Sequence, residues 1–136
     1  KNENRHWKNL LTISQYHLGS NRLSNAVICL WEAIMNRLSE LYEIKRGKKG
    51  DKKLKAIALN FRNDISVDRK HILKYKNLYK PAGKVNDLRK KIAHGNMSKD
   101  HRYEDLKSKI EGLHSDIVKL FDDSDMDLIR RKVHLE

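Results

Sequence analysis

Apolar residues recur at every third or fourth position along the segment 23–44, which corresponds to about six turns of a helix. A helix with one apolar face has to bury that face against other elements. No segment of the chain alternates between apolar and polar residues as a half-buried strand does. The sequence therefore predicts an all-α protein. The stripe consists of Leu23, Val27, Leu30, Ile34, Leu38, Leu41 and Ile44.

The same spacing predicts several further helices, with little sequence between them. The stripes of 23–44 and 106–120 are expected to pack on each other. The predicted architecture is an antiparallel bundle of about five to six helices. The additional helices are expected over 7–18, 54–65, 68–79, 84–94 and 98–120, with one short helix after residue 122.

Polar residues, glycine and proline indicate where these helices begin and end. We expect Ser20 or Asn21 to cap the helix over 23–44. The run 45–50 contains two glycines and four basic residues, and it is predicted to be a polar loop. Pro81 is expected to separate the helix before it from the helix after it.

The 136 residues suit one domain. We expect this domain to span residues 1–134 and to belong to a longer protein, since the chain begins at Lys1. Leu135 and Glu136 resemble a cloning remnant and are left out of the interpretation.

Positive charge is concentrated in the middle third of the chain. The net charge is +12, and between Lys45 and Lys91 there are 17 Lys and Arg residues against four Asp and Glu residues. From Glu104 to Asp127, eight acidic residues outnumber three lysines. A concentrated positive field attracts phosphate backbones. It also keeps a small helical domain soluble, and charge alone does not separate the two explanations.

Several classes of function have no support in the sequence. No stretch approaches 18 uninterrupted apolar residues, so no membrane span is expected. The single cysteine, Cys29, forms no internal disulfide and favours a reducing compartment such as the cytoplasm. There is no glycine-rich phosphate loop, and the seven histidines lack the spacing of a zinc site. We therefore expect no cofactor and no metal.

One segment combines basic charge with a chemically useful pair, namely Leu-Arg-Lys-Lys-Ile-Ala-His-Gly over 88–95. On a straight helix Arg89 and His94 lie about 140° apart, and His94 points away from the apolar stripe. Histidine titrates near neutral pH, and arginine stays charged. The alternatives are a histidine that interacts with the helix dipole and an arginine in a surface ion pair.

At these residues the sequence resembles the HEPN superfamily (higher eukaryotes and prokaryotes nucleotide-binding domains). The match is the Arg-x4-6-His signature, here Arg89 and His94, on a short helix that lies between two long ones. The resemblance implies a helical bundle that forms a homodimer. It also implies a metal-independent endoribonuclease, as found in toxins and antiviral-defence proteins, with Arg89 and His94 as the catalytic pair.

Two residues of these types suffice for RNA cleavage because RNA carries its own nucleophile, the ribose 2′-hydroxyl. Histidine can move protons to and from the reacting oxygens, and arginine can stabilise charge on the phosphoryl group. The products would be a 2′,3′-cyclic phosphate and a 5′-hydroxyl, and DNA would be spared.

Other residues extend the predicted RNA site. Glu32 is expected either to orient Arg89 as a counter-ion or to face solvent. Asn96 either contacts a phosphate or completes the turn after the helix. The predicted phosphate contacts are Lys90 and Lys91, with Lys48, Lys49, Lys52 and Lys53 as a further track.

Two other functions remain open. Lys90 stands where many HEPN members carry a different polar residue after the arginine, so the chain could be a catalytically inactive module that dimerises or binds RNA for a larger protein. A basic helical DNA-binding protein ranks last, because no helix carries a cluster of base-reading residues. The expected partners are RNA, a second copy of the chain, and an antitoxin or further domains of a longer protein.

Overall fold

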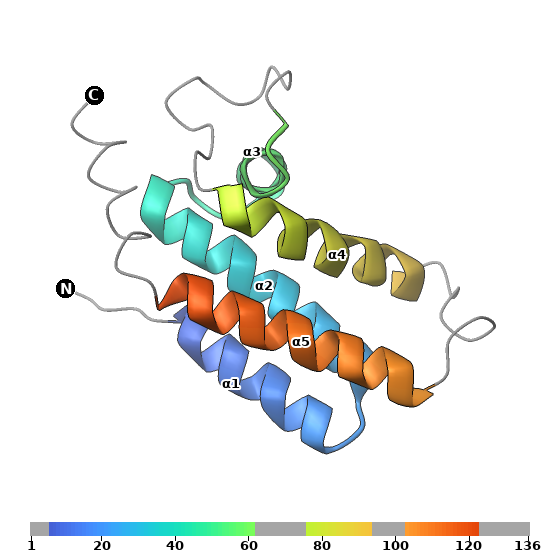
Figure 1. The fold of residues 1–136 in the computed structure, drawn as a ribbon. Coiled ribbons are helices and arrows are strands. Elements are labelled where there is room, and N and C mark those ends of the chain that lie inside the picture. Colours follow the sequence, from blue (N-terminus) through green and yellow to red (C-terminus); the bar gives the residue numbers. More distant parts are fainter. Residues whose placement is uncertain (1–5, 62–75, 94–102, 123–136) are drawn as a thin grey trace.

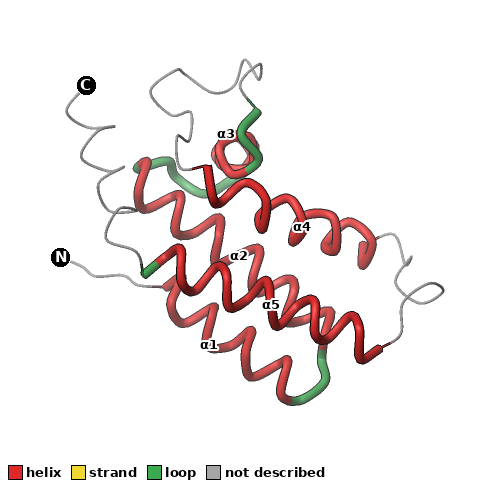
Figure 2. The backbone as a smooth tube through the Cα atoms, viewed as in Figure 1, coloured by secondary structure: helices red, strands yellow, loops and turns green. Residues whose placement is uncertain are grey.

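The computed structural model describes residues 6–61, 76–93 and 103–122 (Figure 1). This part of the chain forms helices and contains no strand (Figure 2). None of these helices is both long enough and apolar enough to cross a membrane. The helices are α1 (His6–Gly19), α2 (Leu23–Tyr42), α3 (Lys48–Ala58), α4 (Lys76–Ala93) and α5 (Tyr103–Phe121).

Four of the helices form an up-and-down bundle, and the fifth crosses it. The chain runs in alternating directions through α1, α2, α4 and α5, whereas α3 is seen along its axis next to α2 and α4 (Figure 1). Helix α2 contacts each of the other four helices. The predicted all-α class and the antiparallel bundle are therefore confirmed, as is the packing of the second helix on the last one.

The core is centred on α2 because apolar side chains occupy more than one face of this helix. Every residue of the predicted stripe within α2 is buried, and Ile44, which follows the helix, is half-buried. Ala26 and Ala33 are fully buried and let neighbouring helices approach closely. Each large aliphatic side chain buried in this way contributes about 1.5–3 kcal/mol. Burial of these side chains therefore places α2 in the middle of the bundle.

Two buried hydrogen bonds hold α1 in place. The hydroxyl of Ser14 donates to the carbonyl oxygen of Ala26 over 2.8 Å, which connects α1 to α2. The Nε2 atom of His114 in α5 lies 2.8 Å from the carbonyl oxygen of Leu11. Because buried polar groups need partners, these bonds define the depth at which α1 packs.

The start of α3 differs from the prediction. The run 45–50 was expected to be a loop, but α3 begins at Lys48. The Asp51 carboxylate accepts a hydrogen bond from the Gly47 N–H over 3.2 Å, which compensates one free amide at the helix start. Gly50 packs so closely against the Lys45 carbonyl that a Cβ atom would overlap it. The glycine at position 50 therefore allows a close backbone contact and does not indicate a loop.

Pro81 does not end a helix, so the prediction that it separates two helices is wrong. Helix α4 continues through it, so the described parts of the predicted helices over 68–79 and 84–94 are one helix. A proline inside a helix costs about 3 kcal/mol. Leu78, Val85 and Leu88 are at most 1% exposed, and burying each contributes about 1.5–3 kcal/mol. Burial of the stripe outweighs the unfavourable proline.

Two further boundaries differ from the prediction. The N-cap position of α2 is Arg22, because Asn21 turns the chain with a φ of 60° and the N–H of Arg22 donates to the carbonyl of His17. Helix α3 ends at Ala58, and a turn directs Phe61 outward, where it is 48% exposed. The predicted elements over 62–75, 94–102 and after 122 lie outside the described residues.

Candidate nucleic-acid interface

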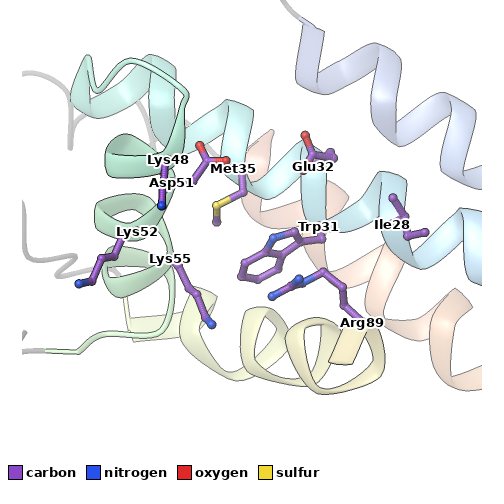
Figure 3. A pocket seen from close by; sticks show the side chains of 9 residues that line it. All are labelled: Ile28, Trp31, Glu32, Met35, Lys48, Asp51, Lys52, Lys55 and Arg89. Atoms are coloured by element: carbon purple, nitrogen blue, oxygen red, sulfur yellow. The ribbon is translucent and has the colours of Figure 1, made fainter. Parts of the chain in front are cut away.

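A groove of about 550 Å³ lies between α2, α3 and α4 (Figure 3). Its size falls in the range of small-ligand sites. The apolar part of the lining comes from α2, and most of the charged part comes from α3 and α4. We call it the cationic groove. Its lining residues are Ile28, Trp31, Glu32, Met35, Lys48, Asp51, Lys52, Lys55 and Arg89.

Arg89 is held against the wall of the cationic groove by two contacts. Its guanidinium carbon lies 4.8 Å from the centre of the Trp31 ring, and its Nη2 atom donates to the Oδ1 atom of Asn86 over 2.7 Å. Both supports are firmly placed, because Trp31 is 6% and Asn86 3% exposed. Among the described residues, no carboxylate pairs with Arg89. The guanidinium is therefore oriented by the fold, and no carboxylate of the described part of the chain neutralises it.

The carboxylate of Glu32 pairs with Arg46. Its Oε1 atom lies 3.1 Å from the Nη2 atom of Arg46, so the alternative in which Glu32 orients Arg89 is not found, and the Glu32 side chain is 42% exposed to solvent. Arg46 follows α2 in the connection to α3, and from there it also reaches the carboxylate of Asp51, with Nε 2.6 Å from Oδ1. One guanidinium thus joins a carboxylate of α2 to a carboxylate of α3.

Arg46 changes the electrostatics of this connection. Its hydrogen bonds hold the pKa of Asp51 below the ordinary value, and Asp51 in turn raises the pKa of Arg46. Among the described residues, Glu32 and Asp51 are the only carboxylates that line the cationic groove, and both are bound by Arg46. Lys48, Lys52, Lys55 and Arg89 provide the positive charge of its lining.

Lys55 brings a second cation toward Arg89. The pKa of Lys55 is lowered, first by burial and then by the positive charges of Lys90 and Arg89. The amine of Lys55 and the guanidinium of Arg89 point toward each other from α3 and α4, beside the ring of Trp31 (Figure 3). Like charges gathered in this way repel each other, and an anion between them would remove the repulsion.

The structure divides the lysines that were predicted to bind RNA. Lys48 and Lys52 line the cationic groove, whereas Lys49 and Lys53 are exposed and do not line it. Lys48, Lys52 and Lys55 share one face of α3 because they are spaced by four and three residues. Lys55 was not among the phosphate contacts predicted from the sequence. Its position on this face becomes visible only when the helix is known to begin at Lys48.

The remaining predicted residues follow Arg89 in the chain. Lys90 is exposed and Lys91 is half-buried near the end of α4. His94 and Asn96 lie outside the described residues, beyond Ala93, at which α4 ends. The pairing of Arg89 with His94 therefore stays a prediction.

Asp51→Asn is expected to lower the free energy of unfolding near neutral pH by about 0.2–1 kcal/mol, because the pair with Arg46 is partly exposed. In the folded protein the pKa of Asp51 lies below its ordinary value of 3.8. Its contribution is therefore fully present above that value and is lost as the pH falls through the folded-state pKa. Urea unfolding of both proteins across a pH series measures this difference. Equal stability near neutral pH would contradict the prediction.

Comparisons of the chain with protein-family models, with curated proteins and with solved structures found no match. The cationic groove is therefore interpreted from its own residues. Within 6–61, 76–93 and 103–122, no group of three or more His, Cys, Asp or Glu residues could hold a metal ion.

Proposed function

We propose that this chain is a metal-independent endoribonuclease of the HEPN type, with Arg89 and His94 as its catalytic pair. The observation that carries the proposal is the placement of Arg89. Its guanidinium has no carboxylate partner among the described residues, and it stands at the wall of a groove lined by lysines. Guanidinium groups in such positions are well suited to bind phosphodiesters.

The proposed reaction needs only proton transfers and charge stabilisation. One histidine accepts the proton of the ribose 2′-hydroxyl, and the 2′-oxygen forms a bond to the adjacent phosphorus. The bond between phosphorus and the 5′-oxygen breaks, and this oxygen takes up a proton from a second acid. Arg89 stabilises the negative charge on the phosphoryl oxygens. Because Trp31 and Asn86 already orient its guanidinium, little reorganisation is needed as that charge develops.

The proposal includes a homodimer, in which His94 of one subunit acts as the base and His94 of the other as the acid. It also includes a role as a toxin or as the effector of a defence system, restrained by an antitoxin or by further domains of a longer protein. These parts rest on the resemblance to the HEPN superfamily and not on the cationic groove.

Incubation of the purified protein with single-stranded or tRNA-like RNA in excess chelator tests this function. The expected products carry a 2′,3′-cyclic phosphate and a 5′-hydroxyl, which mass spectrometry identifies. The matched control is the same RNA with 2′-deoxyribose at the cleaved position, which should stay intact. Cleavage of the control, or intact RNA at equimolar protein, would exclude the mechanism.

A second candidate is a catalytically inactive module that binds RNA. It is favoured by the same contacts of Arg89, because stacking on a buried tryptophan and bonding to a buried asparagine are also what a purely structural arginine does. This candidate predicts RNA binding that weakens steeply with salt and yields no cyclic phosphate. The product analysis therefore separates the two functions.

A further inference from the structure

The strongest feature outside the predicted motif is the position of Lys55. This lysine lies in the third turn of α3, is half-buried, and lines the cationic groove opposite Arg89. Figure 3 shows its amine directed toward the guanidinium of Arg89, whereas the amine of Lys52 points away from it. Two helices that are separate in sequence therefore bring two cations to one place.

The described part of the fold does not neutralise this pair of cations. No carboxylate of the described residues pairs with Lys55 or with Arg89. The carboxylates of Glu32 and Asp51, which line the same groove, are both bound to Arg46. Lys90, which follows Arg89 in α4, adds a further positive charge that Lys55 experiences. Without a ligand, this arrangement is unfavourable for the folded state.

An arrangement that destabilises the free protein is expected at a binding site, where a ligand supplies the missing charge. A phosphate group suits these two residues well. A guanidinium offers several donors in a plane, and an ammonium adds a compact charge with three rotatable donors. Because α2, α3 and α4 line the cationic groove, a ligand would reach Lys55 and Arg89 from its open side.

We propose that Lys55 and Arg89 together bind one phosphate group, and that in the working protein this is a phosphodiester of the RNA strand. The identity of the ligand rests on the proposed function, whereas the phosphate site itself does not require cleavage. Lys55 is accordingly a phosphate-binding residue, and Lys48 lies farther along the same face of α3, where a neighbouring phosphate would pass.

The test compares Lys55→Gln with Lys84→Gln, which removes the same charge from an exposed position of α4 that does not line the groove. Binding is measured with a 2′-deoxy oligonucleotide, which resists the proposed cleavage, at several salt concentrations. Lys55→Gln is expected to weaken binding about tenfold and to reduce the salt slope by about one. Lys84→Gln is expected to change the affinity less than about twofold. Equal effects of the two variants would overturn the proposal.

A second measurement uses inorganic phosphate instead of a nucleic acid. Phosphate is expected to raise the urea midpoint of the original protein more than sodium chloride of equal ionic strength does, because it binds the folded state. Lys55→Gln should lose this extra stabilisation. Without phosphate and at low salt, Lys55→Gln should be at least as stable as the original protein, because it removes a repulsion. A clear loss of stability in this variant would show that Lys55 is structural and would overturn the proposal.

These outcomes separate the phosphate site from the nuclease. Cleavage of RNA together with equal binding by Lys55→Gln and Lys84→Gln would support the nuclease proposal and contradict the phosphate site. Binding that depends on Lys55, without any cleavage, would support the phosphate site and contradict the nuclease proposal. Absence of binding to both the oligonucleotide and phosphate would overturn the phosphate site.

Discussion

Arg89→Ala is expected to lower kcat/KM for RNA cleavage by about 100-fold or more, while the protein stays folded. The loss follows from the proposed role, since removing a single preorganised donor to the developing charge costs about 10²–10³ in rate. The measurement is single-turnover cleavage in chelator, with circular dichroism as the check on folding. His94→Ala should produce a loss of similar size.

Arg89→Lys is the informative companion of Arg89→Ala. It keeps the positive charge but not the planar set of donors, nor the same stacking on Trp31. A partial recovery of activity relative to Arg89→Ala is expected. Full cleavage by folded Arg89→Ala would show that the guanidinium takes no part in the reaction. It would leave RNA binding without catalysis as the better description.

Trp31→Ala is expected to lower the free energy of unfolding by about 3–5 kcal/mol. Trp31 is 6% exposed, belongs to the central helix α2 and lines the groove between α2, α3 and α4. For a domain whose total stability is of the order of 5–15 kcal/mol, this is a large fraction. Urea denaturation followed by circular dichroism measures the effect, and an unchanged midpoint would contradict the packing described for α2.

Trp31→Phe separates the structural role of this residue from its support of Arg89. A phenylalanine keeps an aromatic face for the guanidinium, so activity is expected to survive in a protein that is less stable than the original but folded. A folded Trp31→Phe protein without activity would indicate that the indole itself contacts the substrate.

The helices could be predicted from the sequence because their spacing of apolar residues records which face is buried. This held for α2 and α5, where long stripes leave little ambiguity. It failed where a tertiary contact overrides local preference. Pro81 is tolerated within α4 because the stripe on both sides of it is buried, and Gly50 serves a close contact with Lys45.

The candidate site could be predicted only in part, for a similar reason. Arg89 stands out because of its spacing to His94. Trp31 and Asn86, which orient it, are indistinguishable in sequence from a core aromatic and an ordinary helical asparagine. Nothing in the sequence distinguishes Lys55 from the many other lysines of the middle third of the chain. The partner of Glu32 depends on which arginine the folded chain brings near it, and that arginine is Arg46.

The close contact between Gly50 and the Lys45 carbonyl has a consequence for the evolution of the site. Even the methyl group of an alanine at position 50 would overlap the Lys45 carbonyl, so α3 would have to shift, and Lys55 would shift with it. The spacing between α3 and α4, which carry Lys55 and Arg89, thus depends on the absence of a side chain at Gly50. A substitution of Gly50 is therefore expected to weaken the proposed phosphate site, although Gly50 does not line the cationic groove.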